Sequence, residues 1–172
     1  VPIADYLDQL AVKILSSASG LQHLCTALSL TFKTNAKLFA AIEGFEEAIE
    51  CYENALLCAQ EAADSSDAID DIHNVAIVHK EYGLFWVNQG MTEKAKEHYL
   101  KSLFICEQLS DKQGTYYQRL DVAYLNHKLF EIEAQPQKEQ YLLIAYDEAR
   151  KLCLEHRNDS SAEFTYIQVA KS

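Results

Sequence analysis

Three basic side chains recur at a constant separation along this sequence. Lys33, Lys80 and His127 are each 47 residues from the next, and Lys37 lies one helical turn beyond Lys33. The chain carries a net charge of −11, so a basic row would stand out against an acidic background. Each lysine could bind a carboxylate or a phosphate as a point charge, and His127 would make binding depend on pH near its ordinary pKa of about 6.5. The alternative is that these side chains pair with carboxylates on solvated helix faces.

The sequence contains no recognisable catalytic or metal-binding pattern. No GxSxG, HExxH, phosphate-binding loop or GxGxxG segment occurs. The six histidines show no metal-ligand spacing, and the five cysteines include no CxxC pair. We therefore expect no enzymatic activity, no cofactor and no metal. The cysteines are expected to be free thiols in a reducing compartment.

Composition favours helices and narrows the range of partners. Apolar residues make up 49% of the 172 residues, while only 5 glycines and 2 prolines are present, which favours long helices around a core. Excess negative charge repels nucleic acids and anionic membranes. No apolar run approaches the length of about 18 residues that suggests a membrane span. We expect a cytoplasmic chain with no nucleic-acid partner and no membrane insertion.

A shift of 47 residues aligns three copies of one pattern. The first aligned position is small in two of the three copies (Ala48, Ala95 and Leu142). The second is always tyrosine (Tyr52, Tyr99 and Tyr146), and the third is always small (Ala55, Ser102 and Ala149). Apolar residues at helical spacing within each copy predict two antiparallel helices. The sequence thus predicts an all-α fold, with one domain over 1–172 and hairpins near 20–66, 67–113 and 114–158. Flanking helices over 4–17 and 161–171 would cover the ends of the stack.

The second hairpin is predicted in most detail. Gly90 suits the left-handed conformation that follows a helix, and Thr92 is expected to cap the next helix. Gly44 is expected in the corresponding turn of the first hairpin. Gly83 should allow the paired helices to approach closely, with Tyr99 filling the space beside it.

The repeated residues resemble the tetratricopeptide repeat (TPR) family. Tyr82-Gly83 and Trp86 match the first helix of the family's motif, and Ala95, Tyr99 and Ser102-Leu103 match the second. The family's usual period is about 34 residues, so a period of 47 resembles its elongated-helix variant, a right-handed solenoid of α-hairpins. A related α-hairpin solenoid is the alternative.

The resemblance implies a non-catalytic interaction module or scaffold. Such a module binds a peptide or helix of a partner protein in a concave groove lined by the first helix of each hairpin. By register, the groove would expose the basic row and, one turn before it, Ser29, Ala76 and Ala123. The partner-binding residues implied are Lys33, Lys37, Lys80, Leu84, Asn88, Tyr124 and His127. A segment that is acidic or bears a carboxylate is the candidate partner. The alternative is a self-associating structural segment of a larger assembly, forming a homo-oligomer.

Overall fold

The fold is helical throughout the part of the chain that the structure describes. The computed structural model describes residues 18–66, 68–113, 116–134, 136–156 and 159–172. Within these ranges there are seven helices and no strand, which confirms the predicted all-α class. The helices are α2 (Ala18–Ala41), α3 (Phe45–Asp64), α4 (Ile69–Asn88), α5 (Thr92–Gln113), α6 (Tyr116–Ile132), α7 (Lys138–Glu155) and α8 (Ser160–Ala170). The helix predicted over 4–17 lies outside the described residues.

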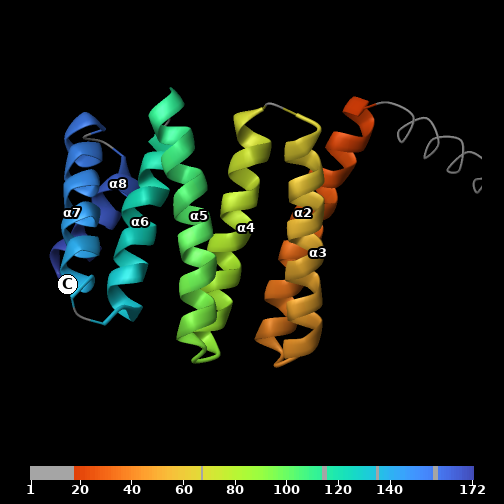
Figure 1. The fold of residues 1–172 in the computed structure, drawn as a ribbon, viewed down its shortest axis with the longest axis horizontal. Coiled ribbons are helices and arrows are strands. Elements are labelled where there is room, and N and C mark those ends of the chain that lie inside the picture. The colour runs from red at the N-terminus through yellow and green to blue at the C-terminus, as the bar shows by residue number, and fades with distance from the viewer. Residues whose placement is uncertain (1–17, 67, 114–115, 135, 157–158) are drawn as a thin grey trace, which may run out of the picture. The chain divides into compact units, whose positions relative to one another are not determined.

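Consecutive helices form the three predicted hairpins, and α8 follows them (Figure 1). The third hairpin is the shortest, with 17 residues in α6 and 18 in α7. The helices of the first hairpin have 24 and 20 residues, and those of the second have 20 and 22. Pro136 lies between α6 and α7, where its ring prevents the first helix from continuing. Along the described residues, no helix combines the length and the apolar character needed to cross a membrane.

Two compact units make up the chain, and α4 contributes to both. One contains the described residues up to Val78, and the other contains those from His79 onward. In the first unit α2 packs along α3. The buried face of α3 is a helical stripe of small residues around one aromatic ring, which lets a neighbouring helix approach closely: Ala48, Tyr52, Ala55, Ala59 and Ala62.

In the second unit, residues 79–88 of α4 pack against α5 at very short range. A Cβ atom placed on Gly83 would lie 2.6 Å from two ring carbons of Tyr99 and 3.3 Å from the carbonyl oxygen of Ala95. Ala95 and Tyr99 are themselves fully buried. The close approach predicted at Gly83 is therefore confirmed, and the tyrosine ring fills the space that the missing side chain leaves.

The turns of the first two hairpins close in the same way. The N–H groups of Gly44 and Met91 each donate to a carbonyl five residues back, at 2.9 Å, as in a Schellman motif. Gly90 is left-handed, with φ 70°, as predicted. In the first hairpin Glu43 takes this conformation, with φ 61°, and Gly44 does not. The Thr92 prediction is wrong, because α5 already begins at that residue.

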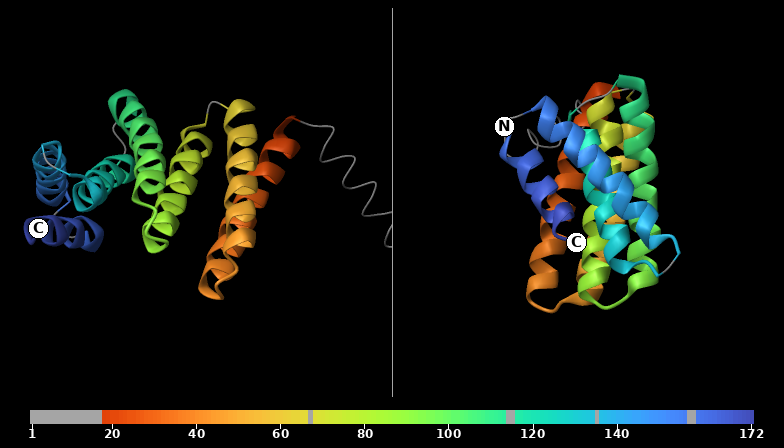
Figure 2. Two further views of the ribbon diagram at one scale, coloured as in Figure 1. Left: turned by 60° about the horizontal axis from the view of Figure 1, so that its bottom comes forward. Right: turned by 90° about the vertical axis from the view of Figure 1, so that its left-hand side faces the viewer.

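The last helix begins one residue earlier than predicted and packs against α7 and α6 (Figure 2). Its N-terminus is capped by Asp159, whose Oδ1 accepts from the N–H groups of Ser161 and Ala162 at 2.8 and 3.2 Å. The same oxygen accepts from the Tyr116 hydroxyl at 2.6 Å, which ties the start of α8 to the start of α6. The cap thus fixes both the beginning and the position of the helix.

The five cysteines, all in the described part of the chain, are free thiols. Burial raises the pKa of the Cys106 thiol to about 12, and burial also raises the pKa of Cys51 and of Cys58. A raised pKa disfavours the thiolate, which is the nucleophilic form. Cys106 belongs to the buried core, whereas Cys51 and Cys58 are half-buried.

Candidate functional site

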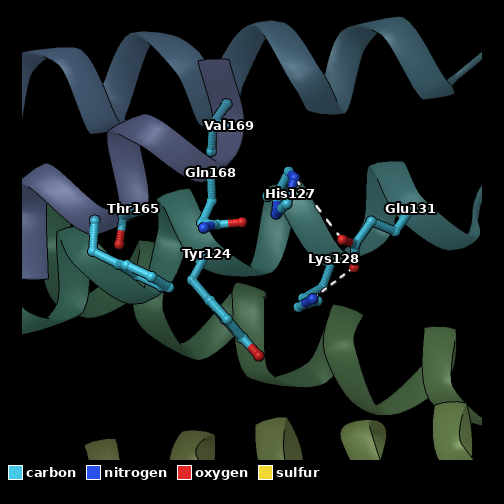
Figure 3. A pocket seen from close by; sticks show the side chains of 8 residues that line it. Tyr124, His127, Lys128, Glu131, Thr165, Gln168 and Val169 are labelled. Atoms are coloured by element: carbon cyan, nitrogen blue, oxygen red, sulfur yellow. Dashed lines mark hydrogen bonds and ion pairs between the residues drawn. The ribbon is translucent and has the colours of Figure 1, made fainter. Parts of the chain in front are cut away.

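A hollow of about 210 Å³ lies between α6 and α8 in the second unit (Figure 3). Figure 3 shows that the side chains of one wall come from α6 and those of the other from α8. The α6 wall holds Tyr124, His127, Lys128 and Glu131, and the α8 wall holds Phe164, Thr165, Gln168 and Val169. Two residues predicted to bind a partner, Tyr124 and His127, therefore line the same hollow.

Tyr124 is flanked by two lysine ammonium groups. The Nζ atoms of Lys80 and Lys128 lie 5.7 and 5.6 Å from the ring centroid, within cation–π range. Each lysine also has an acidic partner: Lys80 bonds to Asp121 at 2.5 Å, and Lys128 bonds to Glu131 at 2.6 Å. Burial raises the pKa of the Tyr124 phenol, so the ring stays neutral at pH 7. The α6 wall is consequently an aromatic surface edged by balanced ion pairs.

His127 is buried in the middle of this wall, between Tyr124 and Glu131 (Figure 3). Its Nε2 lies 2.7 Å from the hydroxyl oxygen of Ser172 and 4.0 Å from a carboxylate oxygen of Glu131. Burial lowers its pKa below the ordinary 6.5, although Glu131 acts in the opposite direction. A Ser-His-Asp triad places its hydroxyl and its carboxylate on opposite ring nitrogens. Here both groups approach the same nitrogen, so the carboxylate does not orient the ring as a general base toward the serine.

A second hollow, of about 380 Å³, lies in the first unit between α2 and the first half of α4. Asp71 of α4 accepts hydrogen bonds from the side chains of Gln22 at 2.5 Å and Thr26 at 3.0 Å, and Asn74 donates to Ser29 at 3.2 Å. These bonds hold the two helices in register. The complete lining is Gln22, His23, Thr26, Ala27, Leu30, Asp71 and Asn74.

The two hollows use equivalent positions of the repeat. Three lining positions of the first hollow recur two periods later in the second, as Leu30 and Tyr124, Asp71 and Thr165, and Asn74 and Gln168. Each hollow is formed by the first helix of one hairpin and the helix that follows that hairpin. The apolar residue comes from the earlier helix, and the amide comes from the later one. The repeat therefore reproduces a local site as well as a fold.

The structure separates the predicted partner-binding residues by exposure. Lys37 and Asn88 are exposed, Leu84 is 39% exposed, Lys80 and Tyr124 are half-buried, and Lys33 and His127 are buried. Ser29, Ala76 and Ala123, predicted to be exposed, are fully buried. Ser29 shows the physical reason in the first unit, because it accepts a hydrogen bond from Asn74 and so lies on the face against the next first helix.

Sequence reasoning missed the contribution of α8. This helix was predicted only as a cover for the end of the stack, yet Thr165, Gln168 and the 64% exposed Phe164 line the hollow. The signal was available in the 47-residue shift, which places Ser160–Ala170 over the start of α6 and so marks α8 as another first helix.

Comparison of the sequence with protein-family models and with curated proteins found no match.

Proposed function

We propose that this chain is a protein-interaction module of the TPR type, which binds a peptide segment of a partner protein between successive first helices. The observation that carries the proposal is the recurrence of a hollow at the same repeat positions in both units. A repeat maintained only for packing needs to reproduce its buried residues. Recurrence of a half-open site at the surface is typical of repeat proteins that bind extended partners.

The proposed occupant is a peptide that carries a large apolar side chain. Phe164 is 64% exposed beside the half-buried Tyr124 ring, so an apolar side chain entering there would cover apolar surface of both walls. The amides of Asn74 and Gln168, on the later helix of each hollow, can donate to and accept from peptide groups. The hollow would thus recognise one side chain together with the main chain beside it.

Charge has a secondary role in this proposal. Lys80 and Lys128 already have carboxylate partners, so a carboxylate on the peptide would share these lysines with Asp121 and Glu131. Side chains of Lys128 and Glu131 are 24% and 44% exposed, and such partly exposed pairs are weak enough to rearrange. An acidic residue next to the apolar anchor is therefore accommodated, but the apolar anchor supplies most of the binding energy.

Peptide selection on the complete chain tests the proposal. Peptides would be selected from a random library on the wild type, and their affinities measured for Phe164→Ser and for Phe104→Ser. Both phenylalanines are 64% exposed, and Phe104 lies on α5 outside the lining of both hollows, so the two substitutions remove equal exposed ring surface. We expect Phe164→Ser to weaken binding by about tenfold or more and Phe104→Ser to leave it unchanged.

A corresponding substitution tests the first hollow. Leu30 is 58% exposed in its lining, and Leu57 on α3 is 65% exposed outside it. Peptides that bind there should lose affinity with Leu30→Ser and keep it with Leu57→Ser. If every selected peptide is indifferent to both Phe164→Ser and Leu30→Ser, the groove function is wrong.

Self-association is the second candidate, and exposed apolar residues on the second helices favour it. Leu57 and Phe104 are at equivalent repeat positions, and both are about two-thirds exposed, at 65% and 64%. Light scattering across a concentration series would show a concentration-dependent mass for the wild type and a lower mass for the Leu57→Ser/Phe104→Ser double variant. A constant monomer mass in the wild type excludes this candidate.

A further inference from the structure

Two histidines from different helices of the second hairpin meet edge to edge. The Nδ1 atoms of His79 on α4 and His98 on α5 are 2.9 Å apart, and the ring centroids are 5.2 Å apart. Both side chains are half-buried. Neither residue lines a hollow described above, so their contact is separate from the proposed groove.

The 2.9 Å separation is an ordinary hydrogen-bond distance, and two ligand nitrogens on one metal ion can have the same spacing. Two metal–nitrogen bonds of about 2.05 Å that meet at a right angle span about 2.9 Å, whereas a tetrahedral angle requires about 3.3 Å. Right angles between neighbouring ligands are typical of square-planar and octahedral sites, which copper(II) and nickel(II) prefer. Imidazole nitrogen is also a ligand that suits both metals.

We propose that His79 and His98 form a two-histidine chelate for a divalent transition metal of the copper and nickel class, with water in the remaining coordination positions. In the metal-free pair, one Nδ1–H donates to the other Nδ1. Metal binding requires the donor ring to move its proton to Nε2, which leaves a lone pair on both Nδ1 atoms, and each ring then turns so that the two lone pairs converge on the metal. No proton is released in this exchange, because each neutral imidazole keeps one.

The surroundings keep both rings available as ligands. Burial is the largest cause that lowers the pKa of His79 and of His98, each to about 4, so protons do not compete for the lone pairs at neutral pH. The charged groups that act on the pair are Lys94, Lys101 and Glu97 of α5, and Lys101 is paired with Glu97 at 2.6 Å.

Packing holds the two helices that carry the rings close together before a metal arrives. The Tyr82 ring lies 4.3 Å from the His98 ring, centroid to centroid. The missing side chain at Gly83 brings α4 and α5 close together around the buried Tyr99. A chelate on such a rigid pair of helices loses little freedom on binding, which raises the affinity of the second imidazole through its high effective concentration.

Nickel titration of the full chain tests the site. Calorimetry with Ni²⁺ alone as the probe should show one site, and nickel should raise the melting temperature. Replacing either histidine by asparagine should weaken binding by about 100-fold, since the chelate becomes a single ligand. His23→Asn, at an exposed histidine on α2, should leave the affinity unchanged.

Two further measurements separate the chelate from adventitious histidine binding and from misfolded variants. Lowering the pH to 5.5 should weaken nickel binding by an exposed histidine about tenfold, because its ordinary pKa is about 6.5, and should weaken binding by the pair less. Lys101→Gln removes an exposed cation near the pair and should tighten binding without altering the core. The proposal is overturned if the wild type binds no nickel, if the His79→Asn/His98→Asn variant keeps the wild-type affinity, or if Lys101→Gln weakens binding.

Discussion

At the scale of single residues, Glu43 occupies a position that suits glycine better. It lies one period before Gly90, in the same turn, and both have positive φ. A side chain costs about 1 kcal/mol in this conformation. We expect Glu43→Gly to raise the free energy of unfolding by somewhat less than this, because glycine also gains freedom in the unfolded chain.

Gly90→Ala supplies the matched control for that prediction. No atom lies within 4 Å of a Cβ placed on Gly90, so its cost is backbone strain alone, about 1 kcal/mol. Urea unfolding should therefore move the two variants in opposite directions. A stabilised Gly90→Ala variant would contradict this view of the turn.

The histidine pair also gives the protein an acid sensitivity with a defined sign. In the folded state both pKa values are about 4, below the ordinary 6.5, so the unfolded chain takes up protons first as the pH falls. The contribution is fully present above pH 6.5 and is lost between 6.5 and 4. At pH 5 we expect a loss of about 2 kcal/mol for the pair, after allowance for solvent screening.

Denaturant unfolding in metal-free buffer at pH 7 and pH 5 measures this loss. The His79→Asn/His98→Asn variant retains every carboxylate of the wild type, so the difference between the two proteins isolates the imidazoles. If the wild type and the double variant lose the same stability between pH 7 and pH 5, the two histidines are not the source of the acid sensitivity.

At the scale of helices, the approach of α4 and α5 depends on Gly83. A methyl group there would be 2.6 Å from the Tyr99 ring, which must then move. Overpacking of this kind costs about 1–3 kcal/mol, so Gly83→Ala should lower the urea midpoint. Combining it with Tyr99→Leu should recover part of the loss, and a fully additive double variant would argue against the contact.

The position of α8 depends on Asp159. This side chain caps α8 and accepts from the Tyr116 hydroxyl of α6. Asp159→Ala should therefore speed amide exchange in α8 while leaving α2 and α3 unchanged. It should also weaken peptides that require Phe164, because the α8 wall of the hollow becomes less ordered. Unchanged exchange in α8 would show that its packing against α7 is sufficient.

Helices were the part of this structure that sequence predicted well. Apolar periodicity and the 47-residue shift located each hairpin, because the small residues at Ala48, Ala95 and Ala55 must be buried wherever two helices meet. Exposure on the first helices was predicted less well. A first helix packs on its hairpin partner and also on the next first helix, so Ser29 and His127 are buried although they carry polar groups.

Contacts between helices were beyond what sequence spacing could show. His79 and His98 are on opposite helices of a hairpin, and their meeting depends on the helix crossing that Gly83 allows. The hydrogen bond from Lys80 on α4 to Asp121 on α6 also joins residues that are far apart in the sequence. Residue types at these positions are visible in the sequence, but only the packing brings them together.

At the scale of the whole molecule, the net charge sets the long-range attraction or repulsion that a charged peptide would meet. With 26 acidic and 15 basic residues, the chain repels itself and other anions. We expect peptides with basic flanks to associate faster than acidic ones with the same apolar anchor, and we expect this advantage to shrink as salt rises from 20 mM toward about 150 mM. Stopped-flow measurement of both peptides tests this, and identical rates at low salt would contradict it.

The recurrence of the hollow at equivalent positions bears on how such a chain can change over generations. Repeated in-frame duplication of a 47-residue segment copies residues of both walls, and Leu30 and Asn74 have counterparts two periods later in Tyr124 and Gln168. The copied site can then acquire substitutions while the original site stays unchanged. Leucine at one site and tyrosine at the other are what such divergence would leave in the gene.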